Sequence, residues 1–271
     1  IPDPLVSRFH SDTEASAGRF RNVLRNPELL RLDFGVFALH AVLMALWLVV
    51  PLSLRQAGLA ADQHWQIYLP VLLISMLLII PAIIYAEKKA KLKPVFTIAV
   101  AILLVSQVLL ASTLDSVWGT AAALLVFFAA FNLLEASLPS LISKIAPVGA
   151  KGTAIGVYSS VQFLGAFTGA TAGGYLYGNH GGLALFAFCG ILLALWLVLA
   201  ATMKAPAAVR TRMYHVQEMD TGRASGLSRE LAALPGVHEA LVLASEGVAY
   251  LKVDMQGFDE ERVVQLLGGE A

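Results

Sequence analysis

The sequence has 271 residues, of which 58% are hydrophobic and only 14% are charged, whereas an ordinary soluble domain carries about 25% charged residues. This composition excludes a soluble globular enzyme, a disordered region and a nucleic-acid-binding protein, so no nucleic-acid partner is expected. The 19 basic and 19 acidic residues cancel, so the net charge identifies no partner. The single cysteine, Cys189, excludes a disulfide framework, a CxxC redox pair and a thiolate metal cluster.

The sequence lacks the signals of secretion and of nucleotide or hydrolytic chemistry. It begins at Ile1, and its first thirty residues contain no long apolar core. We therefore expect no signal peptide and interpret the chain as a fragment of a longer protein. It contains no Walker loop, HExxH, GxSxG or GxGxxG pattern. Neither an enzyme activity nor a cofactor or metal site is expected.

Six apolar stretches dominate the chain, and each is long enough to cross a bilayer as a helix, which takes about 20 residues. Helices are expected because an unpaired backbone group in lipid costs several kcal/mol. The predicted spans are residues 33–54, 66–86, 95–114, 117–142, 153–178 and 183–203. These spans predict an all-α membrane unit embedded in a lipid bilayer.

The basic residues of the connecting segments are strongly one-sided. Alternate connections hold fourteen Lys and Arg residues against the single Arg55 on the other side. The positive-inside rule therefore places both ends of this membrane unit in the cytoplasm. The fourteen residues are Arg8, Arg19, Arg21, Arg25, Arg31, Lys88, Lys89, Lys91, Lys93, Lys144, Lys151, Lys204, Arg210 and Arg212.

The composition becomes polar after the last span. Residues 1–32 are predicted to be a cytoplasmic linker, 33–203 the six-span bundle, 204–212 a second linker and 213–271 a small cytoplasmic domain. Strand-like runs at 213–219, 238–244 and 248–254 alternate with helical patterns at 226–236 and 258–269, and Ser245-Glu246-Gly247 predicts a hairpin turn. The order βαββα predicts a small α+β, ferredoxin-like domain. About sixty residues are marginal for independent stability, so the domain is expected to pack either against another copy, by self-association, or against the membrane unit.

Two ionisable residues lie deep within predicted spans, where such groups are costly and mark functional sites. Glu135 precedes Lys144 by nine residues and His40 follows Arg31 by nine, which places both about 14 Å from the same membrane surface. Both are predicted to handle protons. The alternative is a hydrogen bond between helices, which is a common role for a neutral imidazole or a buried carboxyl.

Other polar residues give weaker signals. Asn132 shares a helix face with Glu135, and Gln162, Tyr158 and Gln107 are further candidates for the substrate cavity, with interhelical hydrogen bonding as the alternative. Gly165, Gly169 and Gly173 form a stripe predicted to pack helices closely, or to slide during a conformational change. Glu87, Lys88 and Lys89 lie where a gating contact could form, although the positive-inside rule also explains these lysines.

The run from Phe131 to Gly178, FNLLEASLPSLISKIAPVGAKGTAIGVYSSVQFLGAFTGATAGGYLYG, resembles the major facilitator superfamily. Together with ALPGVHEALVLASEGVAYLKVD near the end of the chain, it is most similar to the bacterial drug:proton-antiporter-like members that carry a ferredoxin-like YAM domain. The resemblance implies the six-transmembrane-helix half of a major facilitator fold, corresponding to spans seven to twelve, whose missing partner is an N-terminal six-span half.

The resemblance also implies a function. We expect proton-driven efflux of small molecules by alternating access in a bacterial inner membrane, with protons and a small-molecule substrate as partners. Glu87, Lys88 and Lys89 would occupy the family's cytoplasmic loop motif, which steadies the outward-facing state. The alternative is a membrane-anchored sensor whose cytoplasmic domain binds an ion or partner without transport.

Overall fold

A computed structural model describes residues 17–89, 91–205, 209–217, 219–244, 247–254 and 257–267, except for the side chains of residues 17, 19 and 87. The chain divides into two compact units. The helical unit holds residues 27–141 and 156–205. The second unit, called here the sheet unit, holds residues 1–26, 142–155 and 206–271.

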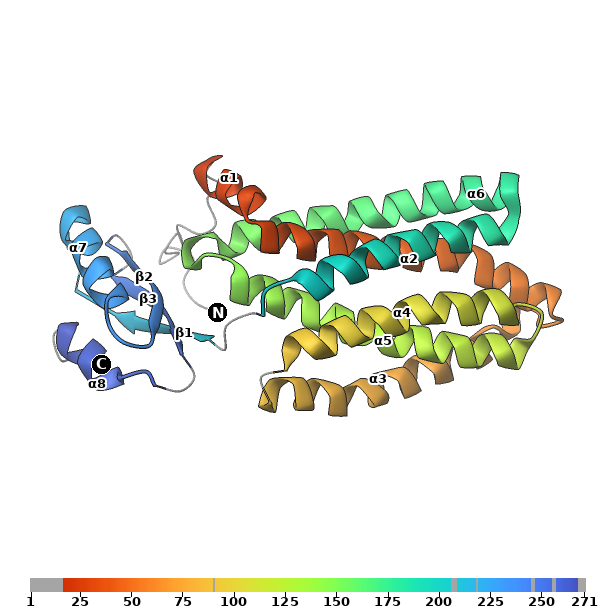
Figure 1. Cartoon of the computed structure of the whole chain (residues 1–271), viewed down its shortest axis with the longest axis horizontal. Helices are drawn as coiled ribbons and strands as arrows, with labels where there is room; N and C mark the ends of the chain where they lie inside the picture. Colours follow the sequence, from red (N-terminus) through yellow and green to blue (C-terminus); the bar gives the residue numbers. More distant parts are fainter. Residues whose placement is uncertain are drawn as a thin grey trace, which may run out of the picture. The chain divides into compact units, whose positions relative to one another are not determined.

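Long helices account for most of the described residues. Five of them are long and apolar enough to cross a membrane. The last, α6, contains a break at Gly181, whose φ of 78° and ψ of −178° are not helical. Its two arms correspond to the predicted fifth and sixth spans, and Figure 1 shows the chain reversing between them. The helices are α1 (Ala17–Arg25), α2 (Pro27–Gln56), α3 (Trp65–Lys88), α4 (Leu92–Thr113), α5 (Val117–Ile145) and α6 (Lys151–Thr202), with short 3₁₀ turns η3 (Ala61–Gln63) and η4 (Val148–Ala150).

The first long helix begins earlier than the hydrophobic pattern indicates. α2 begins at Pro27, six residues before the predicted start of the span at residue 33. Proline is favoured at the first helical position, where its missing N–H leaves no bond unmade. The predicted linker at 1–32 therefore contains α1 and the first turns of α2, and its residues 1–16 lie outside the described part of the chain.

Polar contacts join the start of α2 to the end of α6. The Arg31 guanidinium donates to the carbonyl of Thr202 over 2.8 Å. Glu28 accepts from Arg31 over 3.2 Å and from the main-chain N–H of Lys204 over 3.1 Å. A cation that binds the last carbonyls of a helix also complements its dipole. These contacts hold both ends of the helical unit at the same side of the bundle.

The three glycines of the predicted stripe lie where α6 meets α2. A Cβ atom at Gly165 would overlap the main chain of Phe37, and one at Gly169 would overlap the main chain of Ala41. A Cβ atom at Gly173 would lie 3.2 Å from the Cα atom of Ala45. Contacts at every fourth residue of both helices mean that α2 and the first arm of α6 run in parallel with their backbones close together.

The sheet unit contains the predicted order of elements, β1 (Val209–His215), α7 (Thr221–Ala232), β2 (Val237–Leu243), β3 (Val248–Asp254) and α8 (Glu260–Leu266). The strands form an antiparallel sheet in the order β1-β3-β2. β1 begins at Val209, inside the predicted linker 204–212, because residues 209–212 pair with the end of β3. Of the predicted turn, Ser245 and Glu246 lie outside the described residues, whereas Gly247 adopts a positive φ of 62°.

One face of this sheet is covered by α7 and α8. Leu231 of α7, Leu251 of β3 and Val263 of α8 are fully buried in a shared apolar core. Asp220 caps α7 by accepting hydrogen bonds from the main-chain N–H groups of Gly222 and Arg223. The bonds to Arg223 and Gly222 lower the pKa of the Asp220 carboxyl, because they favour its charged form.

The close packing of α2 and α6 predicts different effects for two glycines of the same helix. Gly169→Ala should destabilise the protein by about 1–3 kcal/mol, because the added methyl group has no space beside Ala41. Gly174→Ala is the matched control, since a Cβ atom there meets nothing within 4 Å. Thermal unfolding of the detergent-solubilised protein would measure both variants, and an equally stable Gly169→Ala protein would contradict the packing.

Candidate functional site

A cluster of three polar side chains joins three helices inside the helical unit. The Nε2 atom of His40 on α2 lies 3.7 Å from Oε2 of Glu135 on α5 and 2.8 Å from Nε2 of Gln162 on α6. The His40 side chain is 10% exposed, whereas that of Glu135 is 36% exposed. The structure thus brings together both predicted proton-handling residues and one predicted cavity residue. Glu135 also presents part of its surface to an open side of the unit.

The hydrogen bonds of His40 define its neutral form. Its Nδ1 atom lies 3.1 Å from the carbonyl oxygen of Val36, which can only accept, so Nδ1 carries a proton. In a neutral imidazole the Nε2 atom is then an acceptor, and it accepts from the amide of Gln162. Oε2 of Glu135 is buried and has no hydrogen-bond partner among the described residues. The Nε2 atom of His40 therefore faces both the Gln162 amide and the Glu135 carboxyl.

The surrounding helices hold this cluster in place. His40 lies one residue before Ala41, which contacts Gly169, so the glycine stripe brings α6 close enough for Gln162 to reach the imidazole. Phe131, four residues before Glu135 on α5, packs edge-on against the His40 ring at 6.0 Å. The cluster is therefore supported by apolar contacts on both α5 and α6.

A buried carboxyl, Asp33, was missed by the sequence analysis. It is 5% exposed, and neither of its carboxyl oxygens has a hydrogen-bond partner among the described residues. It lies seven residues before His40, about 10 Å along α2. The signal was present, because an acidic residue interrupts the apolar run LLRLDFGVF. It stands at the first residue of the predicted span 33–54.

Tyr158 on α6 interacts electrostatically with both Glu135 and Asp33. It is 5% exposed, its hydroxyl has no hydrogen-bond partner among the described residues, and both Glu135 and Asp33 act on it electrostatically. Tyr158 precedes Gln162 by four residues and therefore shares its face of α6. The structure thus associates this predicted cavity residue with the His40 cluster.

The remaining cavity candidates have different surroundings. The Asn132 amide donates to Ser75 Oγ on α3 over 2.9 Å, and Ser75 donates in turn to the carbonyl of Leu72 over 2.8 Å. Gln107 is buried, but its amide nitrogen contacts only its own helix, 3.5 Å from the carbonyl of Leu103 and 3.4 Å from Ser106 Oγ. The structure brings Asn132 to α3 and gives Gln107 no contact with the His40 cluster among the described residues.

The predicted gating residues lie at the end of α3. Lys88 and Lys89 are exposed, and neither forms a side-chain hydrogen bond or ion pair among the described residues. The side chain of Glu87 lies outside the described part of the structure. Nearby, Lys91 donates to the hydroxyl of Tyr85 over 3.3 Å.

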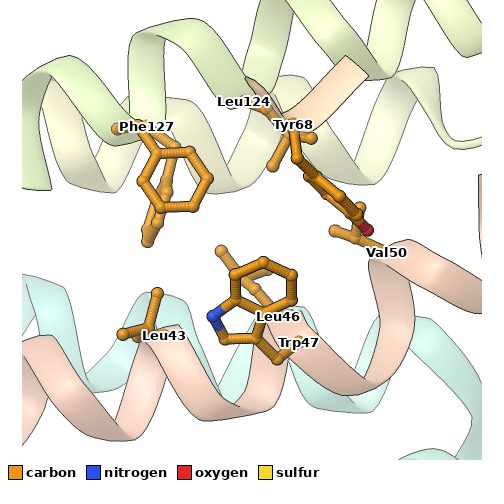
Figure 2. A pocket seen from close by; sticks show the side chains of 8 residues that line it. Leu43, Leu46, Trp47, Val50, Tyr68, Leu124 and Phe127 are labelled. Atoms are coloured by element: carbon orange, nitrogen blue, oxygen red, sulfur yellow. The ribbon is translucent and has the colours of Figure 1, made fainter. Parts of the chain in front are cut away.

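A small apolar pocket lies between α2, α3 and α5, as Figure 2 shows. Trp47 packs against Tyr68 with ring centroids 5.1 Å apart. The cavity of about 10 Å³ leaves room for about one water-sized molecule. Trp47 follows His40 by seven residues, so the pocket lies about 10 Å from the cluster along α2. Its walls are formed by Leu43, Leu46, Trp47, Val50, Tyr68, Leu124, Phe127 and Phe128.

The hydrogen bond between Asn132 and Ser75 can be measured by a double-mutant cycle. We expect Ser75→Ala and Asn132→Ala to couple by about 0.6 kcal/mol, the average for hydrogen bonds between transmembrane helices. Ser106→Ala combined with Asn132→Ala is the control and should be additive, because Ser106 donates to its own helix at Leu103. Equal coupling in both cycles, measured by reversible unfolding in detergent, would contradict the contact.

Comparison with known proteins agrees with this architecture. The family model of the Major Facilitator Superfamily matches residues 22–227. The chain is 38% identical, over 94% of its length and 56% of the relative's, to the inner membrane transport protein YajR of Escherichia coli strain K12. It is 32% identical, over 55% of its length and 38% of the relative's, to an uncharacterized transporter of Buchnera aphidicola. The chain spans about half the length of these curated relatives, and it belongs to the major facilitator superfamily of integral membrane transporters.

Proposed function

We propose that this chain is the C-terminal half of a proton-coupled transporter that exports small molecules by alternating access. The observation that carries the proposal is the 3.7 Å approach of His40 to Glu135 inside an apolar helical unit. Ionisable groups in such surroundings are costly and mark proton or substrate pathways. Membership of a transporter superfamily supports movement of a solute rather than catalysis.

In this cluster, protonation of His40 would change which neighbouring helix its side chain bonds. In the neutral form of His40, Gln162 donates to Nε2 and connects α6 to α2. When Nε2 takes up a proton, it becomes a donor and favours the Glu135 carboxylate on α5. Protonation would then exchange an α2–α6 hydrogen bond for an α2–α5 ion pair. Such an exchange between two discrete arrangements is what ion-coupled alternating access requires.

The remaining parts of the proposal concern substrate, orientation and the sheet unit. Asn132 and Tyr158 lie within one turn of Glu135 or Gln162 on their own helices and would face the substrate. The fourteen-to-one distribution of basic residues supports placing both ends of the helical unit in the cytoplasm. The βαββα order and the antiparallel β1-β3-β2 sheet support a ferredoxin-like cytoplasmic domain with a regulatory role.

The proton-coupling role of Glu135 can be tested in the full-length protein reconstituted into proteoliposomes. Across an imposed pH gradient, a panel of cationic and neutral compounds should reveal gradient-driven movement of at least one. Glu135→Gln should reduce that movement to the background level, because the amide cannot load and unload a proton. Thermal stability should remain near that of the unmodified protein, since the side-chain shape is kept.

A matched substitution separates this effect from a general loss of charge. Asp115→Asn removes an exposed carboxyl between α4 and α5 and should leave transport unchanged. Full gradient-driven movement in the Glu135→Gln protein would contradict the coupling role. Absence of movement in the unmodified protein for every compound would contradict the transporter proposal itself.

A further inference from the structure

The free face of the sheet carries a row of polar side chains that crosses all three strands. Thr211 of β1 is paired with Lys252 of β3, and Lys252 is paired with Glu239 of β2. Directly paired residues project to the same face of a sheet. This face is opposite to the one covered by α7 and α8, because neighbouring residues such as Leu251 and Val253 point into their apolar core.

Each member of the row contacts the segment that connects α5 to α6. The Lys252 ammonium donates to the carbonyl of Ala146. The main-chain N–H of Val148 donates to Oε1 of Glu239 over 3.0 Å. The Lys151 ammonium donates to Thr211 Oγ1 over 2.8 Å. The segment and the sheet belong to the same compact unit.

Burial and charge distinguish this contact from an ordinary surface ion pair. The Lys252 side chain is only 8% exposed, and its ammonium lies 3.3 Å from Oε2 of Glu239. A buried charge is costly unless it is paired and hydrogen-bonded. Glu239 supplies the ion pair and Ala146 supplies the hydrogen bond. Lys252 is therefore satisfied fully only when the 146–151 segment lies on the sheet.

Apolar contacts complete the docked arrangement. Val148 and Ala150 are 5% and 4% exposed. Gly149 approaches Leu241 of β2 so closely that a Cβ atom would lie 2.8 Å from Leu241 Cδ2. The segment thus packs closely on this face, where a side chain added at Gly149 would have to displace the end of the Leu241 side chain.

The docked segment connects the two helices whose side chains compete for His40. α5 ends at Ile145 and carries Glu135, and α6 begins at Lys151 and carries Gln162. The three polar contacts hold positions 146, 148 and 151, which span the whole connection. A change in the spacing or rotation of α5 relative to α6 at this end must break at least one contact.

We propose that the free face of the sheet is a docking surface for the 146–151 segment, and that docking acts as a brake on the relative movement of α5 and α6. The effect on transport rests on the proposed function, whereas docking itself does not. The Glu239–Lys252 pair is the releasable element, since loss of the Glu239 charge leaves the buried Lys252 ammonium without its ion-pair partner. Anything that competes for this face, such as an acidic or carboxyl-bearing ligand on Lys252, would release the brake.

Docking is tested in the full-length protein by a cysteine pair. In a Cys189→Ala background, Gly149→Cys combined with Leu241→Cys should form a disulfide or react with a short bifunctional thiol reagent. Gly149→Cys combined with Glu230→Cys is the matched control, because α7 covers the opposite face and this pair should not be linked. Failure of the first pair to link in membranes, or equal linking of the control, would overturn docking.

The brake is tested by flux and by hydrogen exchange in the same full-length protein. Glu239→Gln combined with Lys252→Met should speed amide exchange at 146–151 and raise the transport rate about fivefold, the low end of typical coupling between sites. Glu260→Gln removes an exposed ion pair with Arg212 in the same sheet unit and should change neither quantity. Cross-linking the 149–241 pair should slow transport, and reduction should restore it.

The outcomes separate the two proposals. Faster exchange together with faster flux supports the brake. Faster exchange with unchanged flux, or unchanged flux after cross-linking, overturns the brake in a protein that demonstrably transports. If the unmodified protein transports no compound, the transporter proposal fails, while cross-linking and exchange still decide whether the segment docks.

Discussion

The close approach of α2 to the first arm of α6 is the contact on which the candidate site depends. Gly165, Gly169 and Gly173 remove the side chains that would separate the two backbones. Without an apolar driving force between helices in lipid, such contact is stabilised by packing and by the hydrogen bonds that it permits. One of those bonds joins Gln162 to His40. The glycine stripe and the polar cluster are therefore one structural feature.

That feature gives His40 two alternative partners on two different helices. With Nδ1 bonded to the carbonyl of Val36, the Nε2 atom is the one that faces Gln162 and Glu135. An imidazole that changes from acceptor to donor changes which neighbour it favours. The buried carboxyl of Asp33 and the hydroxyl of Tyr158 extend the same polar region along α2 and α6. The site is a property of three helices and not of any one residue.

The sheet unit places a comparable constraint on the connection between two of these helices. A buried lysine is satisfied by a carboxylate on the neighbouring strand and by a main-chain carbonyl of the connection. In both the membrane cluster and the docked segment, a buried side chain, His40 or Lys252, finds a hydrogen-bond partner on another element, since leaving such a group unpaired is costly. The same physical constraint gives the protein two places where helix movement has an energetic consequence.

The sequence by itself determined the membrane helices, because their length and apolar content leave no alternative in lipid. It also determined the order of strands and helices in the sheet unit, through the periodicity of its apolar residues. It also indicated Glu135 and His40, since ionisable residues in apolar runs stand out. It did not single out Asp33, which lies at the edge of an apolar run. The place of Gln107 in the cavity stays a prediction, although its amide contacts its own helix. Only the tertiary structure decided that Gln162 and Glu135 meet at one imidazole nitrogen and that Lys252 reaches Ala146. Those contacts join residues about a hundred positions apart, and no local pattern specifies which helix faces align.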